Sequence, residues 1–282
     1  MERFEGKVAV VTGAASGIGY ALASKLGELG MRIAAADVEV EALGRAERAL
    51  RERGIEAIGV ATDVRSAASV RALADRTLAA FGAVHVVCNN AGVFAGGLCW
   101  EVPVEDWEWV LGVNLLGVIH GIRTFVPLLL AHGGEGHVVN TASMAALTSL
   151  PFAAPYVASK HAVLALSESL QHELALRQAK IGVSALCPEA VATRISDAER
   201  NRPAELRGGP RSDTPERAMI EKALGAAVAK GVPPARIAER VVDAIRARRF
   251  YVLSDDDWRR ASEARHEDIR LGRNPTLAPP GA

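Results

Sequence analysis

Short apolar runs alternate along the chain with longer segments in which apolar residues recur every three to four positions. The runs are apolar on both faces, as strands covered on both sides are, and the longer segments have the helical period. We find no internal repeat and no linker. The pattern predicts one α/β domain over residues 1–282, with a doubly wound parallel sheet of about seven strands and helices on both faces. Expected strands are residues 7–12, 32–36, 55–60, 84–88, 136–143, 181–187 and 250–253, and expected helices are 18–30, 39–53, 67–81 and 156–179.

Two helical segments carry more apolar residues than one face of a sheet can cover. One begins at Tyr156, and the other spans residues 107–130. A helix that is apolar all round is either buried or in contact with a partner. We therefore expect a homo-oligomer.

The composition narrows the possible partners. Apolar residues make up 49% of the chain and charged residues 23%, a balance typical of globular domains. Equal numbers of basic and acidic residues, 33 of each, argue against nucleic acid as a partner. Residues 1–7 lead into the first strand without a signal-peptide pattern. We expect no stretch to approach membrane-spanning length, since His120, Arg123 and Pro127 interrupt residues 118–131. We expect a cytoplasmic protein with no membrane partner.

The cysteines do not suggest a metal centre. They are odd in number and lack the spacing of metal ligands, so we expect reduced thiols that mostly pack in the core, and no metal. They are Cys88, Cys99 and Cys187.

A glycine-rich turn joins the first expected strand to the first expected helix. Residues 12–19 read Thr-Gly-Ala-Ala-Ser-Gly-Ile-Gly. Glycines let the backbone approach a pyrophosphate, and the helix that follows offers unpaired N–H groups and the positive end of its dipole. The spacing differs from the usual G-x-G-x-x-G pattern, so an ordinary tight turn is the alternative interpretation.

Asp37 follows the second expected strand, eighteen residues after Gly19. An acidic residue at this place can hold both ribose hydroxyls of NAD. It would also repel the additional phosphate of NADP, and its neighbours Ser16 and Val38 carry no positive charge. The sequence therefore favours NAD. The alternative role for Asp37 is an N-cap of the helix expected over residues 39–53, and both roles can coexist.

Tyr156 and Lys160 form the most informative pair in the sequence, with Ser143 thirteen residues upstream. A four-residue spacing places both side chains on one face of a helix. A phenol has a pKa of about 10, and a neighbouring cation lowers it. The pair can therefore exchange a proton with an alcohol or a ketone.

Further motifs follow in order: Asp63-Val64 after the third strand, Asn89-Asn90-Ala91-Gly92 after the fourth, and Asn114 in a long helix. Together with the glycine turn, Ser143, Tyr156 and Lys160, they resemble the short-chain dehydrogenase/reductase family in its single-domain, NAD-dependent form. The resemblance extends from about residue 7 to residue 253. It implies a Rossmann-type fold and, through the two apolar helices, a homotetramer.

The resemblance also implies a role for each catalytic residue. Tyr156 would be the general acid/base, Lys160 would lower its pKa and bind the nicotinamide ribose, and Ser143 would donate a hydrogen bond to the substrate oxygen. Asn114 would hold a water that links Lys160 to solvent. Among the cofactor residues, Asp63 would accept from the adenine amino group. The implied NAD-binding residues are Gly13, Ser16, Gly17, Ile18, Gly19, Asp37, Asp63, Val64, Asn90, Ala91, Gly92, Tyr156, Lys160, Pro188, Val191 and Thr193.

The expected substrate side is mostly apolar. Glu189 stands where the family usually has glycine after the proline, and it either points outward or turns into the pocket to bind a substrate hydroxyl. Residues 194–232 are expected to form a lid whose arginines are nearly balanced by acidic residues, so we expect it to be solvated. Residues 254–282 form a C-terminal extension. The expected substrate residues are Phe94, Ala145, Leu150, Phe152 and Glu189.

The sequence thus predicts an NAD-dependent oxidoreductase that interconverts a largely apolar secondary alcohol and its ketone, a small-molecule substrate. One alternative is a catalytically silent NAD-sensing or scaffolding protein. The other is an NADPH-dependent 3-oxoacyl carrier-protein reductase, which Asp37 disfavours. NAD use makes oxidation the expected direction.

Overall fold

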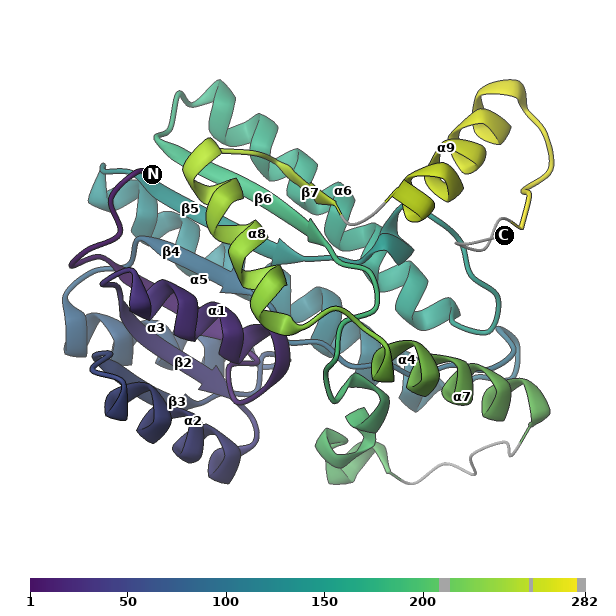
Figure 1. The fold of residues 1–282 in the computed structure, drawn as a ribbon, viewed down its shortest axis with the longest axis horizontal. Coiled ribbons are helices and arrows are strands. Elements are labelled where there is room, and N and C mark those ends of the chain that lie inside the picture. The colour runs from purple at the N-terminus through teal and green to yellow at the C-terminus, as the bar shows by residue number, and fades with distance from the viewer. Residues whose placement is uncertain (208–213, 254–255, 278–282) are drawn as a thin grey trace.

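A computed structural model describes residues 1–207, 214–253 and 256–277. Seven parallel strands form one sheet in the order β3-β2-β1-β4-β5-β6-β7 (Figure 1). This confirms the predicted doubly wound sheet. The strands are β1 (Val8–Thr12), β2 (Arg32–Asp37), β3 (Ala57–Ala61), β4 (Val86–Asn89), β5 (Gly136–Thr141), β6 (Ile181–Cys187) and β7 (Tyr251–Leu253).

Helices cover both faces of the sheet (Figure 1). Successive residues of β1 alternate between two cores, so Val11 packs with α1, α2 and α8, whereas Val10 packs with α3, α5 and α6. The helices are α1 (Gly17–Glu28), α2 (Val40–Glu52), α3 (Ala67–Phe81), α4 (Val104–Leu111), α5 (Gly117–His132), α6 (Ala154–Leu176), α7 (Pro215–Ala229), α8 (Pro234–Ala247) and α9 (Asp256–Leu271).

The strand order places the site. The chain leaves β3 at one edge and returns to the sheet beside β1 as β4, so the connections that follow β1 and β4 run to opposite sides. In open α/β sheets, ligands bind in the crevice at the carboxyl ends of strands where the order reverses. The ends of β1 and β4 therefore locate the site.

Two element boundaries differ from prediction near this edge. The fifth strand ends at Thr141, so Ser143 lies beyond it and caps a short 3-10 turn, η2 (Met144–Ala146). The helix expected from Tyr156 begins at Ala154, because Pro155 in its first turn has no N–H to satisfy. It ends at Leu176, before Gln178 adopts a left-handed φ of 53°.

A π-helical segment, η1 (Gly112–Leu116), connects α4 to α5. The continuous helix has 29 residues and, by length and composition, could cross a membrane, so the expectation that no segment approaches that length is wrong. Its residues Phe125 and Leu129 pack in the core. Helices of this kind also form the cores of proteins that never meet a membrane.

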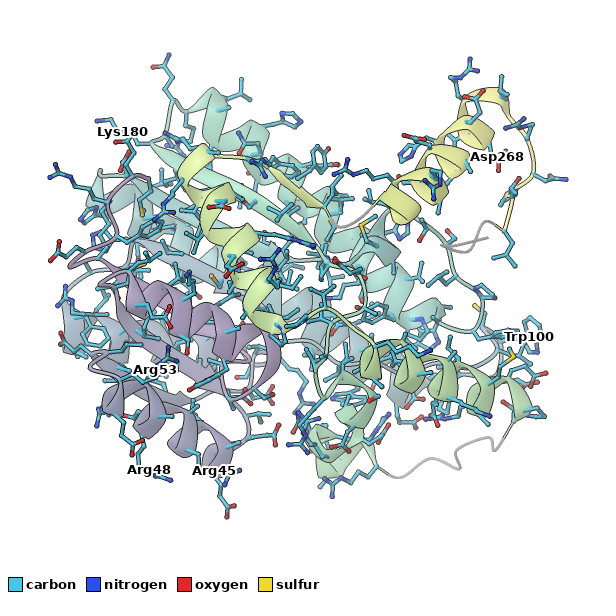
Figure 2. All side chains as sticks on the ribbon, in the orientation of Figure 1. Arg45, Arg48, Arg53, Trp100, Lys180 and Asp268 are labelled. Atoms are coloured by element: carbon cyan, nitrogen blue, oxygen red, sulfur yellow. The ribbon has the colours of Figure 1, made fainter. Side chains whose placement is uncertain are left out.

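The C-terminal helix α9 projects away from the sheet (Figure 1). Asp268, labelled in Figure 2, accepts hydrogen bonds from Arg273 and from the Thr276 backbone N–H at 3.0 and 2.8 Å. These bonds fold the residues after α9 back onto the helix. Residues 254–255 and 278–282 of the expected extension lie outside the described residues.

Candidate active site

A cavity of about 860 Å³ lies at the carboxyl ends of the strands. Its wall contains most of the residues that the sequence singled out, from the glycine turn, the ends of β2 to β5, α6 and the loop after β6. Three of the predicted catalytic, cofactor and substrate residues are not among the described lining residues: Gly19, Asn114 and Phe152.

The glycine turn is shaped by left-handed backbone and close packing. Gly13 and Gly17 have φ angles of 67° and 55°, which glycine adopts without strain. A Cβ at Gly19 would lie 2.0 Å from the Gly13 carbonyl oxygen, and one at Gly17 would lie 3.0 Å from the Thr193 methyl group. Gly19 therefore lets α1 pack on the turn, and Gly17 lets the loop after β6 approach it.

Thr12, which we did not predict, joins the ends of β1 and β4. Its hydroxyl oxygen accepts from the N–H groups of Asn90 and Ala91 at 2.9 and 3.1 Å. The Asn90 amide donates to the Thr12 carbonyl at 3.0 Å and accepts from the Thr141 hydroxyl at 3.3 Å. These bonds fix the backbone of the predicted cofactor residues 90–92 beside the glycine turn.

Asp37 ends β2 and lines the cavity. Its carboxylate accepts from the N–H groups of Ala15 and Glu39, each at 3.0 Å. Burial raises its pKa above the ordinary value, against the effect of these backbone hydrogen bonds. The N-cap position of α2 belongs to Glu39, so Asp37 is not the cap considered as its alternative role.

Asp63 also lines the cavity, but its carboxylate binds Arg65. Arg65 donates to both oxygens, at 3.1 Å from Nε and 2.7 Å from Nη2, and a further bond of 3.1 Å joins it to Glu205. The expected bond from Asp63 to an adenine amino group would therefore share this carboxylate with Arg65.

Ser143, Tyr156 and Lys160 meet on one side of the cavity. The Lys160 Nζ lies 5.6 Å from the centre of the Tyr156 ring and donates to the Thr141 carbonyl at 2.8 Å. The Ser143 oxygen accepts from the Ala145 N–H at 3.1 Å. Phe94 completes the surroundings, with its ring centre 5.3 Å from that of Tyr156.

Burial dominates the acidity of this group. It raises the pKa of Tyr156, and the hydrogen bond with Ser143 opposes that shift. Burial also lowers the pKa of Lys160 to about 8. The net shift of the Tyr156 pKa is therefore upward, opposite to the expected lowering, because removal from water outweighs the Ser143 hydrogen bond.

Asn114 lies in the π segment, behind the cavity wall. Its side chain accepts from the Val93 N–H at 2.8 Å and donates to the Val93 carbonyl and the Ser159 hydroxyl at 3.0 and 3.1 Å. A Cβ at Gly92 would lie within 3.7 Å of both Asn114 and Lys160. Asn114 thus positions the loop after β4 against α6. The π segment aims this side chain, a common use of such irregularities.

Four of the five predicted substrate residues line the cavity, and one does not. Phe94, Ala145 and Leu150 line the cavity, and so does Glu189. Both carboxylate oxygens of Glu189 accept from Arg240 of α8, at 2.8 and 3.1 Å, and its side chain is buried. It therefore neither points outward nor offers a free carboxylate.

Phe152 lies outside the described lining. Its φ is 60°, and its carbonyl accepts from the Gly97 N–H at 2.9 Å. This left-handed turn fixes the loop before α6 to the loop after β4.

Sequence reasoning missed the walls supplied by α4 and α7. Trp109 and Val113 come from α4 and η1. The α7 residues recur at helical spacing, so an apolar stripe within the lid was the signal that could have identified them. They are Ile220, Ala223, Leu224, Ala227 and Val228.

Two of the lid arginines, Arg202 and Arg217, are buried, which corrects the expectation of a solvated lid. Arg202 and Arg217 both bind Asp106 of α4, the latter at 3.2 Å, and all three are buried. Arg202 also stacks over Trp109 at 4.3 Å from the ring centre. The lid is thus anchored on α4. Arg211 and Asp213, which were counted among the basic and acidic residues of the expected lid, lie outside the described residues.

Two of the three cysteines, Cys88 and Cys187, pack in the core as expected, whereas Cys99 is exposed. Within residues 1–207, 214–253 and 256–277, no group of three His, Cys, Asp or Glu residues could hold a metal ion. Burial raises the pKa values of Cys88 and Cys187 to about 12, so both thiols are protonated.

Comparisons with known proteins agree with this geometry. Residues 7–204 match the family model described as short chain dehydrogenase. A short-chain dehydrogenase/reductase from Burkholderia phymatum, solved in complex with NAD, is 48% identical and has a TM-score of 0.96, with 98% of each chain covered.

Two curated relatives are also similar over nearly the whole chain. The 1-deoxy-11-beta-hydroxypentalenate dehydrogenase of Streptomyces exfoliatus is 36% identical, covering 97% of this chain and 91% of that protein. The C alpha-dehydrogenase of Sphingobium sp. strain SYK-6 is 33% identical, covering 95% and 87%. The chain belongs to the short-chain dehydrogenase/reductase family of oxidoreductases.

Proposed function

We propose that this protein is an NAD-dependent oxidoreductase that interconverts an apolar secondary alcohol and its ketone. The observation that carries the proposal is a single cavity with Ser143, Tyr156 and Lys160 in one part of its wall and Asp37 in another. A binding protein needs no acid/base group beside a buried lysine, which disfavours the sensing or scaffolding alternative.

The residues present fit a nicotinamide dinucleotide. Gly13, Ser16 and Gly17 line the cavity at the N-terminus of α1, where backbone N–H groups can bind a pyrophosphate. Asp37 has no cationic partner among the described residues, so its carboxylate can accept from ribose hydroxyls. NAD, when bound, supplies the hydride acceptor. The similar structure solved with NAD supports this choice. A carrier-protein reductase using NADPH is disfavoured, because Asp37 would repel the additional phosphate.

The protein side of the chemistry is proton transfer and orientation. Burial keeps the Tyr156 phenol protonated at neutral pH, ready to donate a proton to a ketone oxygen. In the oxidative direction the phenolate accepts the alcohol proton, and the Lys160 ammonium beside the ring stabilises that charge. Ser143 donates to the same oxygen and orients it.

The substrate class follows from the apolar part of the cavity wall. Phe94, Leu150 and the α7 stripe give it an apolar surface, which suits a largely apolar alcohol. The relative named for dehydrogenation of a hydroxypentalenate supports oxidation of an alcohol. We include a cytoplasmic location and a homotetramer in the proposal. Exposed leucines at 116, 130 and 176 on the two apolar helices support an oligomer.

Formation of reduced nicotinamide from NAD across a panel of apolar secondary alcohols tests this function. Tyr156→Phe should lower kcat by about 10²–10⁴-fold, because it removes the proton-transfer group. Binding of NAD should stay within about twofold, since the hydroxyl alone is deleted.

Tyr251→Phe is the matched control. Its hydroxyl bonds to Glu168 on the exposed surface, so turnover should be unchanged. Substantial turnover by Tyr156→Phe would place the acid/base elsewhere. Silence across the panel despite tight NAD binding would favour the sensing role.

A further inference from the structure

The lid contacts the α2 end of the cavity through an ion pair. Arg200 of η3 (Ile195–Asn201) binds Glu39, the residue directly before α2. The Glu39 Oε1 accepts a hydrogen bond from the Arg200 Nε at 3.0 Å and lies 2.9 Å from the Arg200 Nη2 in an ion pair. Both side chains line the cavity, as do Asp37 and Val38. A lid cation thus stands at the end where Asp37 would hold the adenosine ribose.

Arg200 is oriented by its own segment as well as by Glu39. Its Nη1 donates to the carbonyl oxygens of Arg194 and Asp197 at 2.9 and 2.6 Å. These two bonds leave the Nε and Nη2 edge of the guanidinium directed at Glu39. Without the Glu39 carboxylate, this edge would still face the same end of the cavity, with two donors for another anion.

The other arginines near this end are neutralised or face elsewhere. Arg65 lines the cavity but is bound by Asp63 and Glu205. Arg45 and Arg48 of α2 are exposed and extend outward from the helix (Figure 2). Arg200 is therefore the cation best placed to meet a phosphate near Asp37. Glu39 is its nearer carboxylate at 2.9 Å, whereas the Asp197 carboxylate lies 3.9 Å from Nη1 and is more exposed.

A 2′-phosphate distinguishes NADP from NAD at this place. Asp37 disfavours that phosphate by like-charge repulsion. Arg200 would favour it, because a guanidinium edge binds phosphate oxygens through paired, charge-assisted hydrogen bonds. With Glu39 ionised, its carboxylate lies against the Nε and Nη2 edge of Arg200, and the pair has no net charge.

We propose that Glu39 is a specificity-determining residue, which holds Arg200 in an ion pair and so prevents the lid from recruiting NADP. This inference rests on the proposed use of NAD at Asp37. The two carboxylates act differently: Asp37 repels the additional phosphate, and Glu39 removes the attraction that the lid would exert on it.

The test is direct binding of NADH and NADPH, measured by calorimetry on the full chain. Glu39→Gln keeps the size of the side chain and removes the negative charge that pairs with Arg200, so NADPH should bind about tenfold more tightly, the gain expected of new charge-assisted hydrogen bonds. NADH should change by less than about twofold, since it has no group for Arg200 to bind. Adding Arg200→Met to Glu39→Gln should abolish the gain.

Glu47→Gln is the matched control. Glu47 lies on α2, the helix that Glu39 precedes, and it pairs with Arg51. Its side chain is 24% exposed, against 22% for Glu39, but it does not line the cavity among the described residues. It should leave both affinities unchanged. A Glu39→Gln protein that folds like the wild type yet gains no NADPH affinity would overturn the inference, as would a gain that persists in Glu39→Gln/Arg200→Met.

Failure of the proposed function has a different signature. Equal affinity of the wild-type protein for NADH and NADPH would refute the NAD preference, whatever Glu39→Gln does. A wild-type preference for NADH that Asp37→Asn weakens and Glu39→Gln leaves unchanged would preserve the function and reject the role of Glu39.

Discussion

Two buried sets of cations in this molecule are handled in opposite ways. Lys160, at 2% exposure, donates to the Thr141 carbonyl, and no carboxylate among the described residues binds it. In the lid, Arg202 and Arg217 share Asp106, which is itself 3% exposed, and each binds a second carboxylate, Glu199 or Glu221.

The difference separates a charge kept for chemistry from charges that hold structure. A buried cation without a counterion is unfavourable, because it has lost its contact with water. Burial therefore lowers the pKa of Lys160 to about 8. Buried arginines surrounded by carboxylates retain their charge and anchor one element to another. An unpaired buried cation next to a phenol is therefore a stronger sign of function than the more numerous charges in the lid.

Asp106→Asn would make the strongest test of this contrast. It leaves Arg202 and Arg217 without their shared carboxylate, and breaking a buried ion pair in this way typically costs about 3–5 kcal/mol. We expect a loss of that size in the free energy of unfolding, measured by urea denaturation. Glu108→Gln, on the exposed side of the same helix, should change it by less than about 0.5 kcal/mol. Equal effects of the two substitutions would show that the lid network does not stabilise the fold.

Lys160→Met should increase the stability of the protein, in contrast to Asp106→Asn, while it impairs turnover. The Lys160 pKa falls from 10.5 to about 8 on folding, so the unfolded chain binds the proton more tightly between these values, and stability rises with pH across that window. Removing the charge should stabilise the protein by up to roughly 3 kcal/mol at neutral pH.

That advantage of Lys160→Met should shrink as the pH rises from about 8 toward 10.5, where the lysine becomes neutral in both states. Urea denaturation of the wild-type protein and of Lys160→Met at pH 7 and near pH 10.5 would measure this change in their difference in stability. The same difference in unfolding free energy at both pH values would contradict an uncompensated charge at this position.

The smallest effect is expected at a surface pair. Arg236 and Glu239 of α8 lie 3.3 Å apart with both side chains exposed. Water and salt screen such a pair, so Glu239→Gln should change the free energy of unfolding by less than about 0.5 kcal/mol. A loss comparable to that of Asp106→Asn would show that burial is not what distinguishes the lid network.

The features that sequence reasoning anticipated depend on local patterns. The strands and helices follow from hydrophobic period, the turn from Gly13 and Gly17, and the Tyr156 and Lys160 pair from a helical spacing. Even among local features, Phe152 misled us, because a left-handed φ reverses the chain where the sequence shows only an apolar residue. The α7 stripe carried a helical signal that we read as a solvated lid.

The sequence alone determined the sheet, its family and the residues that meet at its carboxyl edge, because each rests on short-range spacing along one element or on the order of parallel strands. Only the tertiary structure decided which charges pair. Glu39 meets Arg200 across 161 residues, Asp106 meets Arg202 across 96 and Glu189 meets Arg240 across 51. Spacing along the chain says nothing about such contacts, since they depend on how the lid and α8 pack against the sheet. Burial likewise belongs to the folded molecule, and it sets the acidity of Tyr156 and Lys160.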